Sequence, residues 1–134
     1  MFKLFNNCKY SESMDEKKKM ELFNNPDMCI EILEEMMNDQ SHKVRIQVAR
    51  HKLTTPEMLD RLSKDNNNFV RSFVAINKNI EMKTMLYLSE DPCENVRFRL
   101  LAENKNLPIE IIKKLSTDEV KYIKTSALQK LSKI

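Results

Sequence analysis

Glycine is absent from the 134-residue chain, although an average usage of about 7% would give roughly nine glycines. Without glycine the chain has no glycine-rich phosphate-binding loop and no dinucleotide-binding fingerprint. Tight hairpin turns need residues at positive φ, so the same absence disfavours β-hairpin folds. Parallel α/β nucleotide enzymes and most all-β folds are therefore disfavoured.

Metal-binding residues are also scarce, with three cysteines and two histidines in the whole chain. Cys8, Cys29 and Cys93 are widely spaced and form no Cys-x-x-Cys pair. A structural zinc site usually requires such closely spaced ligands. We therefore expect no metal and no cofactor, and buried free thiols in a reducing compartment.

Long apolar stretches are missing as well. No segment approaches the roughly 20 apolar residues needed to span a membrane, and the first residues contain no apolar core of a signal peptide. The sequence predicts a cytoplasmic protein without a membrane partner.

Charge is weakly positive overall, at +3, and unevenly distributed. Residues 20–43 contain six acids and one base, whereas residues 96–134 contain nine bases and four acids. A net charge this small does not by itself indicate nucleic-acid binding, but the asymmetry allows association with a partner of mixed charge.

An internal repeat is the strongest signal in the sequence. Val-Arg pairs occur at residues 44–45, 70–71 and 96–97, which are 26 residues apart, and Ile-Lys follows 27 residues later at 123–124. Apolar positions keep the same spacing. The register indicates about four and a half units, which span residues 18–43, 44–69, 70–95, 96–122 and, in part, 123–134.

Each unit has the pattern of two short helices. In the second unit, Val44 and Val48 lie on one side of a first helix that Ser41 is expected to cap, and Thr55-Pro56 is a start signal for a second helix. Asn66–Asn68 are expected to end that helix by adopting the left-handed conformation. Such a helix pair cannot bury its apolar face alone, so the units are expected to stack into a solenoid of either hand.

The combined pattern Val-Arg-x-x-Val-Ala-x-(Asn/His) and Thr-Pro-Glu-x-Leu-x-x-Leu-Ser-x-Asp resembles the leucine-rich repeat variant, a HEAT-like helical repeat family. The resemblance covers residues 18–131 and is best at 44–65, 70–91 and 96–118. It implies a right-handed superhelix. The units here are slightly longer than usual for the family, and Cys8 alone cannot form the iron–sulfur cysteine cluster of some members.

Repeat pattern and resemblance together predict an all-α protein, a short right-handed α-solenoid of about four and a half 26–27-residue two-helix repeats. The solenoid is expected to cover residues 18–134 and to follow an N-terminal cap segment at residues 1–17. Within that segment Ser13 and Glu16 are expected to form a capping box. Phe2, Leu4 and Phe5 are expected to cover the open end.

A base follows an aspartate by six residues in successive units, and the pairs are Asp39/Arg45, Asp65/Arg71, Asp91/Arg97 and Asp118/Lys124. Stacked units would place the bases in a row with steps of about 10 Å, which could follow a phosphate backbone. Since a feature repeated in every unit usually serves the scaffold, we interpret the pairs as a structural ion-pair ladder. Each base can reach its own aspartate or that of the neighbouring unit.

Differences between units indicate where a partner binds. The third unit has apolar residues where the other units have polar or charged ones, and Phe69 replaces Lys43 of the preceding unit. The candidate partner-binding residues are Phe69, Phe73, Leu86 and Tyr87. A cluster of exposed apolar residues often marks an interface; the alternative is that they pack beneath a neighbouring unit.

Catalysis finds no support, because no histidine lies beside a plausible nucleophile and the chain has no paired-carboxylate motif and no metal-ligand spacing. HEAT-like DNA glycosylases would call for a tryptophan-containing pocket, and the chain has no tryptophan. We predict a non-enzymatic protein-interaction module, adaptor or regulatory, whose partner is a protein or a second copy of the chain.

Two alternatives remain open from the sequence. The first is a nucleic-acid-binding repeat protein that uses bases of the second, fourth and final units, namely Arg50, Lys52, Arg97, Arg99, Lys105, Lys113, Lys114 and Lys121. The second is a small inhibitor that sequesters a larger enzyme.

Overall fold

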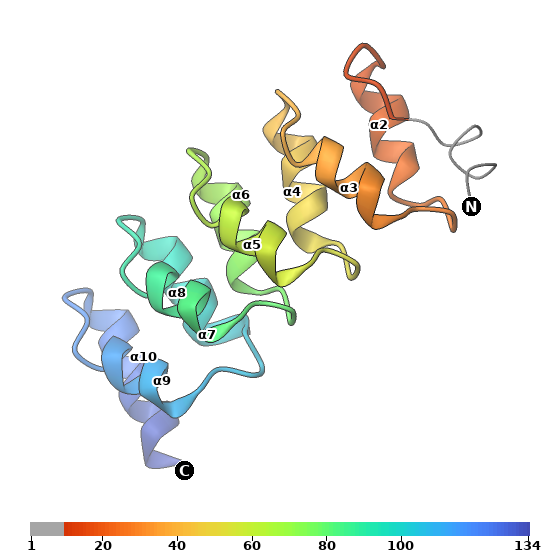
Figure 1. Ribbon diagram of the computed structural model, residues 1–134. Coiled ribbons are helices and arrows are strands. Elements are labelled where there is room, and N and C mark those ends of the chain that lie inside the picture. Colours follow the sequence, from red (N-terminus) through yellow and green to blue (C-terminus); the bar gives the residue numbers. More distant parts are fainter. Residues whose placement is uncertain (1–9) are drawn as a thin grey trace.

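The structure is a computed structural model that describes residues 10–134, and this part of the chain is helical without strands (Figure 1). The helices are α2 (Glu16–Leu22), α3 (Ile30–Met36), α4 (His42–Arg50), α5 (Pro56–Leu62), α6 (Asn68–Ala75), α7 (Met82–Leu88), α8 (Glu94–Glu103), α9 (Ile109–Leu115) and α10 (Lys121–Ser132). The prediction of an all-α protein is confirmed. The expectations for Phe2, Leu4, Phe5 and Cys8 lie outside the described residues.

The helices form two rows. The even-numbered helices pack side by side in chain order, α2 on α4, α4 on α6, α6 on α8 and α8 on α10. The odd-numbered helices α3, α5, α7 and α9 form the front row in Figure 1, and each contacts the even-numbered helix that follows it. Helices α2 and α10 therefore lie at opposite ends of an elongated array.

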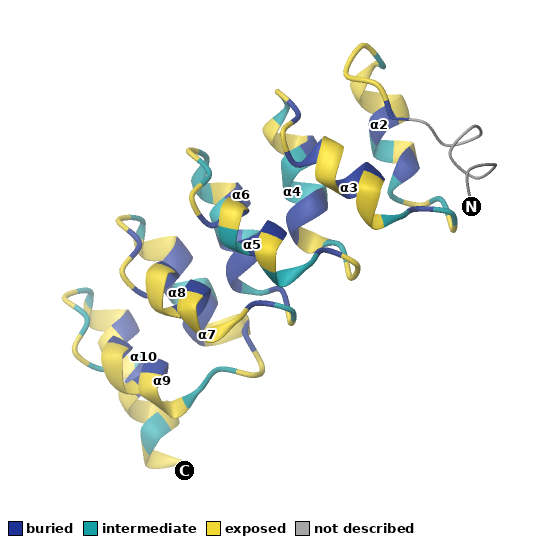
Figure 2. Cartoon of the chain, viewed as in Figure 1, coloured by how far each residue is buried: buried dark blue, intermediate teal, exposed yellow. Residues whose placement is uncertain are grey.

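The core lies between these helices, where Figure 2 shows buried residues on the inner sides and exposed residues on the outer faces. Equivalent apolar residues of α4, α6 and α8 have no exposed surface: Val44, Val48, Ala49, Val70, Val74, Ala75, Val96, Leu100 and Leu101. Their spacing places them on one side of each helix. Leu128 of α10 is at the position of Leu101 but is 51% exposed, because no described helix covers it.

The N-terminal caps of the helices agree only in part with those predicted from the sequence. Thr55 accepts a hydrogen bond from the Met58 N–H and Pro56 opens α5, as predicted. The predicted capping box is wrong: α2 is capped by Asp15, which accepts from the Lys18 N–H at 2.9 Å. The Glu16 carboxylate instead accepts from the Ser41 hydroxyl, so the Ser41 side chain does not cap α4.

Side-chain acceptors form the turns that glycine would usually form. The loop after each odd-numbered helix has an aspartate that accepts from the backbone N–H two residues later, as Asp65 does from Asn67 at 2.9 Å and Asp91 from Cys93 at 2.8 Å. No described residue has positive φ. The left-handed conformation expected for Asn66–Asn68 is therefore wrong, because these bonds satisfy the loop N–H groups with φ negative.

The loop after each even-numbered helix uses the same device. The acceptors at equivalent positions are Asn25, His51, Asn77 and Asn104. His51 is the one member that titrates: its Nδ1 accepts from the Leu53 N–H at 3.1 Å, which requires an unprotonated nitrogen. Burial, and then the charge of Lys52, lower the His51 pKa below its usual 6.5.

We expect the substitution His51→Asn to reduce the pH dependence of stability between about pH 6.5 and 5. The lowered pKa means that the unfolded chain binds this proton more tightly, so the wild-type free energy of unfolding falls as pH drops below 6.5. Asparagine keeps the acceptor and does not titrate. Urea unfolding at both pH values tests this, with the exposed His42→Asn as control; an unchanged pH dependence in His51→Asn would refute the assignment.

Candidate functional site

The predicted aspartates and bases form a continuous set of ion pairs, here called the ladder. Arg71 Nε and Nη2 donate to the two carboxylate oxygens of Asp91 at 2.7 and 3.1 Å, and Arg71 Nη1 donates to the Asp65 carbonyl at 2.8 Å. Arg45 and Arg97 make equivalent bonds to Asp65 and Asp118. Each arginine thus joins the carboxylate 20 or 21 residues later to the carbonyl six residues earlier.

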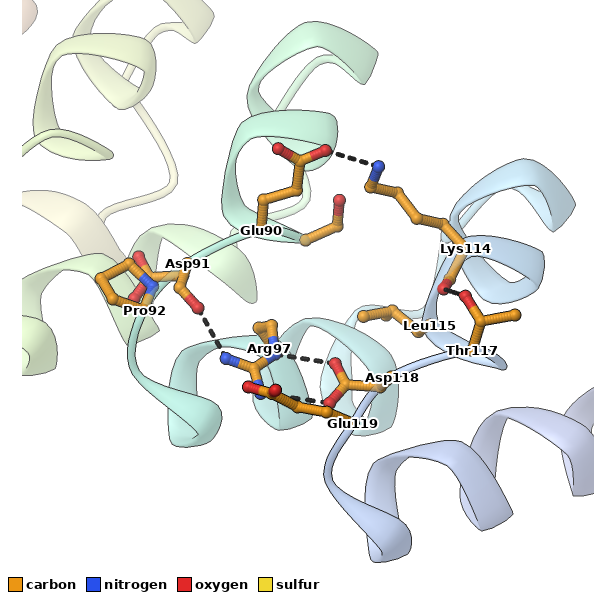
Figure 3. A pocket seen from close by; sticks show the side chains of 10 residues that line it. Glu90, Asp91, Pro92, Arg97, Lys114, Leu115, Thr117, Asp118 and Glu119 are labelled. Atoms are coloured by element: carbon orange, nitrogen blue, oxygen red, sulfur yellow. Dashed lines mark hydrogen bonds and ion pairs between the residues drawn. The ribbon is translucent and has the colours of Figure 1, made fainter.

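Ladder side chains are largely buried, with 13% of Arg71 and 1% of Asp91 exposed. Figure 3 shows Arg97 between the backbone of Asp91 and the carboxylate of Asp118. Burial alone would raise the pKa of the Asp118 carboxyl, but hydrogen bonds from Arg97 and the Val120 N–H outweigh it and lower the pKa. Because each of these guanidinium groups already has at least three acceptors, the geometry favours the structural interpretation over phosphate binding.

The two ends of the ladder differ. At the first, Lys19 donates to Asp39 at 2.7 Å, and the buried Tyr10 hydroxyl donates to the same carboxylate. Burial, with this hydrogen bond, raises the Tyr10 pKa. At the other end, the expected Asp118/Lys124 pair is not formed, because Asp118 binds Arg97. Lys124 is exposed and forms no ion pair with the described residues.

The four candidate partner-binding residues lie on two helices, and three of them are exposed. Leu86 and Tyr87 are 42% and 50% exposed on α7, and Phe69 is 58% exposed at the start of α6. Phe73 is half-buried on α6, where the guanidinium carbons of Arg50 and Arg99 lie 5.3 and 4.6 Å from its ring centroid. The structure therefore places Phe73 in a cluster with Arg50 and Arg99. The sequence analysis had assigned these two arginines to the candidate nucleic-acid-binding residues.

Tyr87 lies at the edge of a hollow of about 330 Å³ between the loops that follow α5 and α7. The Lys64 ammonium is 5.1 Å from its ring centroid, and Arg71 and Asp91 of the ladder line the same hollow. The next hollow along the array, of about 440 Å³, has Lys114 in place of Tyr87 (Figure 3). There Lys114 pairs with Glu90 at 2.5 Å, so this second hollow is lined by an ion pair at the place where the first has an aromatic ring.

The bases predicted to bind nucleic acid fall into three places. Arg97 is buried in the ladder. Lys113 and Lys114 are on α9, and Lys121 begins α10. The remaining four, Arg50, Lys52, Arg99 and Lys105, lie on even-numbered helices or in the loops that follow them. Lys78, which sequence analysis missed, is at the same loop position as Lys52 and Lys105, with spacings of 26 and 27 residues that could have identified it.

The described residues contain few other reactive or metal-binding side chains. Cys29 and Cys93 are free thiols and are half-buried rather than buried as predicted. No group of three or more metal-binding side chains occurs in residues 10–134. Within the same range, no helix has both the length and the apolar character needed to cross a membrane.

Comparison with protein-family models, curated proteins and solved structures finds no match for this chain.

Proposed function

We propose that the chain is a short right-handed α-solenoid of 26–27-residue units, similar to the leucine-rich repeat variant. In support, the helices alternate between two rows, and equivalent ladder, core and turn contacts recur at the repeat spacing. The ladder fixes the spacing of neighbouring units, because each arginine bridges a loop before its helix and a loop after the next one.

For this scaffold the proposed function is non-enzymatic protein interaction through the α7 surface, which is made of Leu86 and Tyr87. One observation supports it above others: both side chains are exposed, whereas α3, α5 and α9 carry charges at these positions. The equivalent residues are Glu34 and Glu35, Asp60 and Arg61, and Lys113 and Lys114.

The α7 surface has the features of an interface centre. Tyrosine is enriched among the residues that dominate binding energy, and its ring loses little conformational entropy when bound. The Lys64 contact restrains the Tyr87 ring and contributes about 0.5–1 kcal/mol at an exposed site. Charged residues on α5 and α9 flank the pair, as the polar rim flanks the apolar centre of a typical interface.

We expect Tyr87→Arg to abolish capture of partner proteins by the immobilised chain from lysate of its native host, with binding reduced at least tenfold. A charge in a contact that must lose its water is costly. The fold should tolerate the change, because Arg61 occupies the same position in α5. The matched control is Glu35→Arg on α3, which should retain the same partners, identified by mass spectrometry.

Two results would count against the proposal. Equal loss of partners in Glu35→Arg would indicate an effect of charge rather than of the α7 surface. A large fall in the melting temperature of Tyr87→Arg, with binding unchanged, would mean that Tyr87 stabilises the fold. Sedimentation of both variants reports whether the partner is a second copy of the chain.

A further inference from the structure

Five bases from three successive helix pairs lie along one side of the array, here called the basic edge: Arg50, Lys52, Lys78, Arg99 and Lys105. Lys78 and Lys105 line one hollow of about 280 Å³, together with Glu103. Glu103 accepts two hydrogen bonds from Arg99, at 3.1 and 2.9 Å. These contacts connect the loop after α6, the loop after α8 and the middle of α8.

Phe73 joins the two arginines of the edge. Arg50 and Arg99 reach its ring from α4 and α8, the helices on either side of α6. Each contact with the ring is favourable, so the phenyl group holds two guanidinium groups near each other. Arg50 has no carboxylate partner among the described residues, and its charge is therefore available to an anion.

Asparagine side chains fix the loops of the edge relative to one another. Asn79 Nδ2 donates to the carbonyls of Lys52 and Thr54 at 2.9 and 3.0 Å. Asn77 Nδ2 donates to the Ala49 carbonyl at 2.8 Å, and Asn104 repeats this bond to Ala75 at 2.9 Å. The three lysine-bearing loops are thus tied to their neighbours, which preorganises the row of charges.

Of the residues that line the hollow of the basic edge, Glu103 is the acidic one, and it pairs with Arg99. Lys52, Lys78 and Lys105 are exposed, and their ammonium groups bind no described residue. The lysines therefore have no structural contact that explains their recurrence at one loop position, in contrast to the arginines of the ladder.

We infer that the basic edge binds the phosphodiester backbone of single-stranded nucleic acid. Lysines at a regular spacing suit a polymer with a regular charge, and a single row matches one strand. Apart from Ile76, the residues that line the hollow of the edge are charged or polar, which suits a charged ligand. The inference does not depend on the α7 surface.

The test is fluorescence anisotropy with a labelled 20-nucleotide poly-uridine probe at several salt concentrations. The triple variant Lys52→Gln, Lys78→Gln and Lys105→Gln should bind at least tenfold more weakly. Its slope of log K against log salt should decrease by about 2, since each single-strand phosphate contact contributes about 0.7. The control triple Lys18→Gln, Lys113→Gln and Lys133→Gln changes the charge equally at exposed sites elsewhere, and should bind nearly as the wild type does.

Several outcomes overturn the inference. They are absence of binding to the probe at low salt, equal losses in the two triple variants, and equal affinity for poly-glutamate of similar length, which would indicate an acidic-protein site. Tyr87→Arg should leave probe binding unchanged, so failure here and failure of the α7 proposal are separate results. Thermal melting confirms that all variants are folded.

Discussion

Replacement of Arg71 by alanine is expected to lower the free energy of unfolding by about 3–5 kcal/mol, the range for loss of one partner of a buried ion pair. The substitution leaves the Asp91 carboxylate, 1% exposed, without its charged partner. It also removes the donor to the Asp65 carbonyl. Urea unfolding followed by circular dichroism measures the change.

Lys124→Ala is the matched control, because Lys124 is at the same repeat position but exposed and outside the ion pairs. Its effect should be within about 0.5 kcal/mol. Oligonucleotide affinity and its salt dependence should be the same in Arg71→Ala as in the wild type at a temperature where both are folded. A stable Arg71→Ala protein with a reduced salt slope would instead identify the ladder as a phosphate-binding row.

Sequence alone predicted the helices well because their signals are local. Apolar spacing within seven to ten residues and a threonine cap with proline, as at Thr55-Pro56, determine where α5 begins. The turns were predicted less well, since asparagine favours both the left-handed conformation and side-chain hydrogen bonding to a nearby N–H. Only the backbone angles distinguish the two. The described residues have no positive φ, so the asparagines of these turns are used for side-chain hydrogen bonding.

The candidate site was harder to predict because its contacts join different units. The register showed that Asp65 and Arg71 recur, but it left open that Arg71 binds the Asp91 carboxylate and only the carbonyl of Asp65. Comparison of units marked Phe73 as unusual, but it did not show that Arg50 of α4 and Arg99 of α8 both contact its ring. Such pairs become visible only when α4, α6 and α8 are packed side by side.

Leu101→Asp is expected to destabilise the protein by at least about 4 kcal/mol, a large fraction of the roughly 5–15 kcal/mol that stabilises a typical domain. Removal of a buried leucine side chain alone costs about 2–5 kcal/mol, and the carboxylate would have to be buried without a partner. Leu101 has no exposed surface. A loss of helical circular dichroism at 37 °C, or a urea midpoint shifted far toward zero, would show the effect.

Leu128→Asp places the same charge at the equivalent position of α10, where the side chain is 51% exposed. It should change the free energy of unfolding by less than about 1 kcal/mol, as surface substitutions usually do. Leu101 and Leu128 have the same position in the repeat and differ in whether a neighbouring helix covers the side chain. The contrast between the two variants therefore measures the effect of that covering helix. Equal destabilisation at both positions would mean that α10 is covered in solution, and a dependence of the Leu128→Asp effect on protein concentration would identify the cover as a second copy of the chain.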